Sequence, residues 1–218
     1  MNTQKRIIIW ASAFLVLAVT VVGIWSATTK TDTAVHPGNG LLTEEVNASD
    51  WTKGSSTPKV TLVEYSDFQC PACGIYYPLI EKAVAEYGDR LAFTYRHFPL
   101  PQHKNALAAS YASEAAGKQG KFWEMHKMIF EHQADWAEKE NAIQVFEEYA
   151  RELKLDLARF TADRTSSETA NNVAHDKETG ISAGVNSTPS FYLNGKKMQN
   201  PRGYEELKAL IEYAITNG

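Results

Sequence analysis

The chain has 218 residues, a formal net charge of −4 and only two cysteines, Cys70 and Cys73. An acidic balance without a basic patch argues against nucleic acid as a partner. About 190 residues follow the first apolar segment, which suffices for one core, with or without an inserted subdomain, but not for two full-sized domains.

The first apolar segment, residues 7–25, is uncharged and as a helix would span roughly 28 Å, close to the ~30 Å core of a bilayer. Its length and the bulky Trp25 favour an uncleaved signal anchor over a cleaved signal peptide. Lys5 and Arg6 precede it, so the positive-inside rule places residues 1–6 in the cytoplasm. We therefore predict a single-pass protein of the cell membrane, with everything after the transmembrane helix in an oxidising, extracytoplasmic space.

Residues 26–40 are mostly small and polar, include Pro37, Gly38 and Gly40, and lack apolar periodicity. This composition is typical of a flexible tether. The folded domain is expected over residues 41–218.

Two strands are predicted at residues 59–65 and 90–98, which are rich in β-forming residues. Between them, apolar residues follow helical spacing, and Gly88 ends that helix. The apolar positions are Tyr76, Leu79, Ile80, Ala83, Val84 and Tyr87. Two strands joined by a helix form a βαβ unit, which predicts a parallel pair.

Residues 99–184 contain no good strand but several helical stretches, at 107–116, 122–130 and 142–153, and so predict a helical insertion. Strand character returns at 190–193, where Asn194-Gly195 predicts a type I′ hairpin into a short strand at 196–198.

The chain ends in a predicted helix. Asn200 is its candidate cap and Pro201 lies in its first turn. The complete order, βαβ, helices and ββα, predicts an α/β fold.

The cysteines form the motif Cys70-Pro71-Ala72-Cys73 between the first strand and its helix. A disulfide across so short a loop removes little entropy from the unfolded chain, so it would stabilise the domain poorly. At a helix N-terminus, unpaired N–H groups and the helix dipole favour a thiolate. The motif therefore indicates a redox-active dithiol.

A zinc site is the alternative, because one CxxC motif supplies half of its ligands. There is no second CxxC. The histidine pairs His97/His103 and His126/His132 are each six residues apart, outside the usual finger spacing, and we predict no metal site.

Residues 63–73 (VEYSDFQCPAC) resemble the active-site segment of the DsbA-like thiol–disulfide oxidoreductases, within the thioredoxin superfamily. Residues 95–100 (YRHFPL), 121–123 (KFW) and 187–191 (STPSF), and the alanine-rich helix from Asn105, are also similar to that family. The resemblance implies a thioredoxin fold with a helical insertion, and a Cys70–Cys73 redox disulfide as the only redox group.

Cys70 is expected to be the exposed attacking thiol, and Cys73, one turn further, the shielded resolving thiol. Pro71 and Ala72 support the site but add no charge to the thiolate. Strongly oxidising members of the family often carry histidine in place of Ala72, so this departure argues against strongly oxidising character.

Glu64 shares a strand face with Val60 and Leu62, and that face is buried in a sheet covered on both sides. The resemblance places an acidic residue here beneath the active site, as a proton relay to Cys73 with a pKa raised by burial. The alternative is a solvent-facing glutamate on an edge strand.

Pro189 opens a strand, where a proline costs no ladder hydrogen bond. The resemblance adds a cis peptide bond between Thr188 and Pro189, packed against the CxxC motif, with the Thr188 backbone available to an extended substrate.

Three functions follow as hypotheses. The first is an oxidase that forms disulfides in exported proteins and is re-oxidised by a quinone-linked membrane partner, as the resemblance implies. The second is a reductase or isomerase supplied by a reductant donor, although residues 26–58 are short for the dimerisation domain of exported isomerases. The third, of another class, is a non-catalytic, membrane-tethered module that binds polypeptides.

Overall fold

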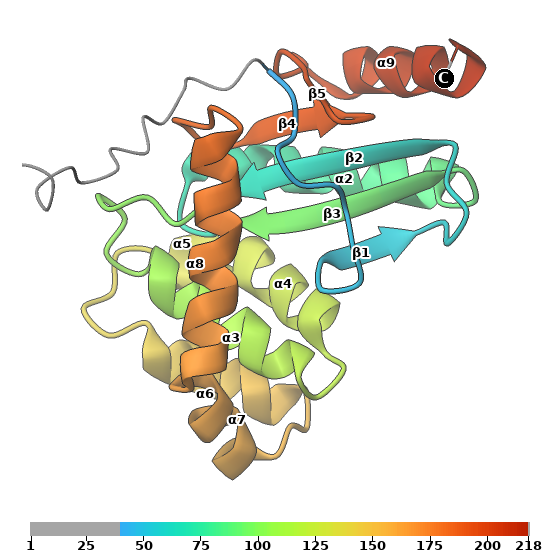
Figure 1. Cartoon of the computed structure of the whole chain (residues 1–218). Coiled ribbons are helices and arrows are strands. Elements are labelled where there is room, and N and C mark those ends of the chain that lie inside the picture. The colour runs from blue at the N-terminus through green and yellow to red at the C-terminus, as the bar shows by residue number, and fades with distance from the viewer. Residues whose placement is uncertain (1–39, 218) are drawn as a thin grey trace, which may run out of the picture. The chain divides into compact units, whose positions relative to one another are not determined.

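This computed structural model describes residues 40–217 (Figure 1). The predicted cytoplasmic end (1–6), membrane anchor (7–25) and tether (26–40, apart from Gly40) lie outside the described residues. Within residues 40–217, no helix is long and apolar enough to cross a membrane.

A mixed five-stranded sheet of order β1-β3-β2-β4-β5 organises the fold. Strands β2 and β3 are parallel, and the other neighbouring pairs are antiparallel. The strands are β1 Trp51–Gly54, β2 Val60–Ser66, β3 Leu91–His97, β4 Ser190–Leu193 and β5 Lys196–Lys197. Helix α2, Pro71–Tyr87, joins β2 to β3, so the predicted parallel βαβ unit and thioredoxin-like α/β fold are confirmed.

Helices cover both faces of the sheet. Helices α2 and α9 (Tyr204–Asn217) contact one face, and α8 (Ser167–Ser182) crosses the other, in front of the sheet in Figure 1. Because side chains alternate along a strand, Leu62 of β2 lies in the core beneath α2, whereas Val63 and Tyr65 lie in the core on the opposite side. The same alternation directs Glu64 towards α2.

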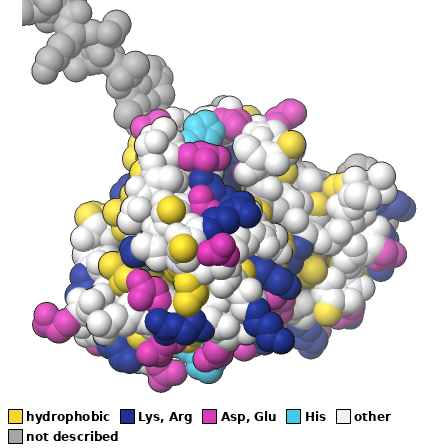
Figure 2. Space-filling model, turned by 90° about the horizontal axis from the view of Figure 1, so that it is seen from below, with side chains coloured by type: hydrophobic (Ala, Val, Ile, Leu, Met, Phe, Trp, Pro, Cys, Tyr) yellow, Lys and Arg dark blue, Asp and Glu magenta, His cyan; other side chains and the backbone are white. Residues whose placement is uncertain are grey.

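Between β3 and β4 the chain forms helices only, as predicted for residues 99–184. They are α3 Ala106–Gly117, α4 Phe122–Glu131, α5 Gln133–Trp136, α6 Ile143–Glu152, α7 Leu157–Arg164 and α8. Seen from below, this part of the surface carries positive and negative side chains interspersed (Figure 2).

The β4–β5 hairpin turns at Asn194 and Gly195, whose φ angles of 47° and 77° are both positive, as a type I′ turn requires. The predicted cap of the last helix was wrong, since α9 begins at Tyr204. Asn200 instead donates from Nδ2 to Pro189 O (2.9 Å), and Pro201 O accepts from the Tyr76 hydroxyl (2.7 Å). These contacts hold the residues outside the helix.

Strand β1 was not predicted. It pairs antiparallel with β3 at the sheet edge, and it has four residues with at most partial burial, so its sequence carries little strand signal.

A buried ion pair ties the chain before β1 to the sheet. Arg96 of β3 donates from Nε to Asp50 Oδ1 (2.7 Å) and from Nη2 to Asp50 Oδ2 (3.0 Å). Its Nη1 donates to the Tyr65 hydroxyl (3.0 Å), and the carbonyls of Glu44 and Glu45 accept further bonds from the guanidinium. Only 1% of Arg96 is exposed, so its charge depends on these partners.

We expect Asp50→Ala to lower the free energy of unfolding by about 3–5 kcal/mol, because it leaves the Arg96 guanidinium buried without its counter-charge. Urea unfolding measures this loss. Asp89→Ala is the matched control: its pair with Arg90 is exposed, and the change should stay below about 1 kcal/mol. Equal losses in the two variants would contradict the role of the buried pair.

Candidate active site

The junction between β2 and α2 is shaped by the buried side chain of Asp67. Its backbone oxygen accepts from Cys70 N (3.0 Å), and its Oδ1 accepts from Gln69 N (2.7 Å). Its Oδ2 lies 2.8 Å from Leu100 N and 2.7 Å from His103 Nδ1. These bonds reverse the chain after β2 and leave Cys70 as the N-cap residue of α2.

The two thiols are free and differ in exposure. Cys70 retains 7% of its accessible surface and Cys73 retains none. The prediction of an exposed Cys70 therefore holds only relative to Cys73. Most of the Cys70 side chain is covered because the segment that carries Thr188 lies against it, and in its protonated form the thiol donates to Thr188 O at 3.4 Å.

The protein environment shifts the pKa values of the two thiols in opposite directions. The hydrogen bond from the Cys73 thiol is the main cause that lowers the pKa of Cys70 to about 5, against the opposing effect of burial. The backbone N–H groups of Cys73 and Ala72 act in the same direction. Burial, and then the bond to Cys70, raise the pKa of Cys73 well above that of an ordinary thiol. Near neutral pH the pair therefore carries one negative charge, on Cys70.

Pro71 and Ala72 occupy the first helical positions after Cys70. Pro71 suits this place because the missing N–H costs no intrahelical bond and its fixed φ matches the helix. Pro71 is exposed and Ala72 packs against the core. Neither side chain carries a charge, so neither brings one to Cys70.

Glu64 is 4% exposed, which rules out the solvent-facing alternative. The Ser66 hydroxyl donates to its Oε1 at 2.7 Å. Burial raises the pKa of Glu64 to about 8, so the carboxyl is mostly protonated near pH 7. When ionised, its charge in turn raises the pKa of Cys73, so the two buried groups share one electrostatic environment.

The Thr188–Pro189 peptide bond is cis and directly precedes β4. Pro189 is buried, and Thr188 meets Cys70 through its carbonyl oxygen. The fold thus brings together Glu64, Cys70, Cys73 and Thr188 from three separate segments of the chain.

The histidines of the candidate zinc pairs serve other partners. His97 Nε2 lies 3.2 Å from Glu114 Oε1, His103 binds Asp67, and His126 is buried among aromatic rings. In the described range 40–217, no three His, Cys, Asp or Glu side chains are placed to bind a metal ion together.

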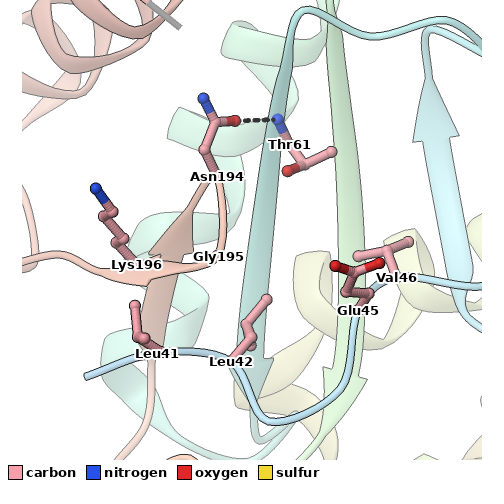
Figure 3. Close-up of a pocket in the computed structure, with 8 residues that line it drawn as sticks. All are labelled: Leu41, Leu42, Glu45, Val46, Thr61, Asn194, Gly195 and Lys196. Atoms are coloured by element: carbon pink, nitrogen blue, oxygen red, sulfur yellow. Dashed lines mark hydrogen bonds between the residues drawn. The ribbon is translucent and has the colours of Figure 1, made fainter. Parts of the chain in front are cut away.

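A pocket of about 540 Å³ lies away from this chemistry (Figure 3). It is lined by the segment Leu41 to Val46, by Thr61 near the start of β2 and by the hairpin turn, where Asn194 Oδ1 accepts from Thr61 N (2.9 Å). Cys70 follows the other end of β2, so this pocket belongs to the junction of the N-terminal segment with the hairpin.

The sequence model described as thioredoxin matches residues 47–213, which include every residue of the site above. The chain belongs to the thioredoxin family. Its fold is shared with solved DsbA proteins, which agrees with the resemblance noted in the sequence.

Oxidised BdbD from Bacillus subtilis is 25% identical to this thioredoxin-family chain, with a TM-score of 0.67 over 78% of this chain and 94% of that one. Alpha-DsbA1 from Wolbachia pipientis is 19% identical, with a TM-score of 0.69 over 78% and 93% of the two chains. The catalytic domain of ScsC from Proteus mirabilis is 19% identical, with a TM-score of 0.66 over 78% and 92%.

Curated relatives include two proteins named Na(+)/H(+) antiporter. NhaA 3 of Salinispora tropica is 34% identical over 77% of this chain, and NhaA 1 of Mycolicibacterium gilvum is 34% identical over 91%. The thioredoxin-family chain spans only 25% and 32% of their lengths, so their names describe much larger proteins.

Sequence reasoning did not assign roles to three residues of the site. Asp67 and Ser66 lie just before the CxxC motif. An acidic residue and a hydroxyl residue at this place are the features of the sequence that could have pointed to them. Gln133 reaches the Cys70 backbone from the helical insertion, and nothing in the local sequence marks it.

We expect Glu64→Gln to stabilise the dithiol form by roughly 3 kcal/mol near pH 7, because folding of the wild type must protonate a carboxyl that is ionised in the unfolded chain. The folded pKa of about 8 lies above the usual value of 4.5 for a glutamate, so the wild type becomes less stable relative to Glu64→Gln as pH rises between those values. Urea unfolding across that pH range should show that the difference in free energy of unfolding between Glu64→Gln and wild type grows with pH.

Glu138→Gln, which alters a 90% exposed side chain, is the control and should leave the pH dependence unchanged. A gap between Glu64→Gln and wild type that stays constant with pH would contradict the buried, protonated state of Glu64.

Proposed function

We propose that this chain is an extracytoplasmic protein thiol–disulfide oxidoreductase that forms disulfides in exported proteins. The observation that carries the proposal is the division of charge between the thiols, a stabilised thiolate at Cys70 and a buried, protonated Cys73. A structural disulfide needs no such division, because neither of its sulfurs has to leave as a thiolate.

The oxidising reaction runs in two exchanges. A substrate thiolate attacks Cys70 Sγ of the Cys70–Cys73 disulfide, so a substrate–Cys70 bond forms and the Cys70–Cys73 bond breaks. Cys73 leaves with the electron pair and takes a proton, which protonated Glu64 supplies. A second substrate thiolate then attacks the substrate sulfur and releases Cys70 as thiolate. The substrate loses two electrons and the enzyme gains them.

The stabilised thiolate favours this direction. A low pKa makes Cys70 a good leaving group and stabilises the reduced enzyme, which makes the disulfide oxidising. The value of about 5 lies between ~7 for thioredoxin and ~3.5 for DsbA. An intermediate oxidant agrees with Ala72 in place of the histidine found in strong oxidants of the family.

The partners in this proposal are thiol-containing, unfolded exported proteins and a membrane redox partner, a quinone-linked oxidase, that removes the electrons. The predicted anchor at residues 7–25 would hold the domain near both, which raises their effective concentration. A reductase or isomerase fed by a reductant donor uses the same site in reverse. A polypeptide-binding module would need neither thiol.

Equilibrating the detergent-solubilised full chain in glutathione buffers measures its reduction potential, which indicates the direction of electron flow. We expect a reduction potential between the ~−270 mV of thioredoxin and the ~−120 mV of DsbA. The lowered pKa of Cys70 is the physical reason. A potential at or below that of thioredoxin would overturn the oxidase and favour the reductase.

Trapping in cells tests the roles of the two cysteines. Cys73→Ala should accumulate mixed disulfides through Cys70, because the resolving thiol is gone, whereas Cys70→Ala should accumulate few. Non-reducing electrophoresis gives the readout. Equal trapping by both would contradict the assignment, and full function of the double variant would support the binding module instead.

A further inference from the structure

The helical insertion reaches the redox site through one side chain, Gln133. It is the first residue of α5, a single helical turn, and this turn is anchored by Trp136. Trp136 is fully buried and donates from Nε1 to Ile129 O (2.8 Å). The anchor fixes the place from which Gln133 extends towards α2.

The side-chain amide of Gln133 binds two backbone carbonyls of the loop that leads into α2, those of Phe68 and of the nucleophile Cys70. Its Nε2 donates to Phe68 O (2.6 Å) and to Cys70 O (3.0 Å). A primary amide nitrogen has two N–H donors, so both are used. The Cys70 carbonyl also accepts from Gly74 N (3.2 Å), the first backbone bond of the helix.

Gly74 makes this approach possible. A Cβ added at Gly74 would lie 2.7 Å from Gln133 Oε1, closer than real Cβ atoms come to another heavy atom, and 3.3 Å from its Cδ, which is a tight contact. Glycine costs up to about 1 kcal/mol in a helix interior relative to alanine. The close approach of Gln133 gives a physical reason for a glycine directly after Cys73.

We propose that Gln133 is a positioning residue of the redox site: from the helical insertion it holds the Cys70 backbone in place. The glycine at position 74 leaves the space that the Gln133 amide needs. This inference rests on the proposed function, since it concerns the same thiol. Gln133 does not need to touch the sulfur. The Cys70 thiolate is stabilised by the Cys73 thiol and by backbone N–H groups of α2, and these act only when the Cys70 backbone keeps its orientation.

The test compares the dithiol–disulfide equilibrium of full-length variants in glutathione buffers. Near pH 7 we expect Gln133→Ala to lower the ratio of dithiol to disulfide roughly three- to tenfold, because a misaligned Cys70 gains less from ionising. Gln133→Glu keeps the shape but cannot donate to the carbonyls and adds a negative charge, so its effect should be at least as large.

The pH profile separates positioning from a general structural defect. The difference between Gln133→Ala and wild type should close as the pH falls towards about 4, where Cys70 is protonated in both proteins. Gln119→Ala is the matched control: Gln119 also makes two backbone bonds, to Asp156, elsewhere in the insertion. It should leave the equilibrium unchanged.

Gly74→Ala completes a double-mutant cycle. In the wild type its Cβ should displace the flexible Gln133 amide and reproduce the Gln133→Ala shift. In the Gln133→Ala background it should add nothing. Equal effects of Gly74→Ala in both backgrounds, or a Gln133→Ala equilibrium equal to wild type at all pH values, would overturn the inference.

The wild-type protein in the same assay distinguishes failure of the proposed function from failure of the positioning role. If wild-type Cys70 and Cys73 do not exchange with glutathione, the proposed function fails. If they exchange and the Gln133 variants behave as wild type, only the positioning role fails. Circular dichroism of each variant checks that it is folded.

Discussion

The chain reversal between β2 and α2 is the constraint from which the properties of the site follow. Asp67 fixes this reversal through bonds to the backbone of Gln69, Cys70 and Leu100. It places Cys70 at a helix N-terminus and Cys73 one turn inside, under the first thiol. A single negative charge is then best placed on Cys70, where N–H groups and a thiol face it, and worst placed on Cys73, which has no access to water.

Glu64 belongs to the same balance of charges. It is buried because side chains alternate along β2 and both faces of the sheet are covered, and it stays mostly protonated for the same reason that Cys73 does. A fold that buries a thiol and a carboxyl together keeps two protons close to one thiolate. That arrangement suits a reaction in which a thiolate leaves and must be protonated.

Sequence reasoning reached the parts of this arrangement that depend on local pattern: the parallel βαβ unit, the CxxC motif at the helix start and the buried face of Glu64. It missed β1 because four partly buried residues carry no period, and it placed a cap at Asn200 because the tertiary bond from Asn200 to Pro189 leaves no local trace. The role of Gln133 could not be predicted for a related reason, because its hydrogen bonds join the insertion to Cys70, 63 residues earlier in the chain.

The division of charge between the two thiols depends above all on the pKa of Cys70. Ultraviolet absorbance of the thiolate can be followed against pH in the full-length dithiol form, with Cys70→Ala providing the baseline. We expect a single titration with a midpoint near 5, assigned to Cys70, and no titration of Cys73 in that range. A midpoint near the ~8.5 of an ordinary cysteine would contradict it.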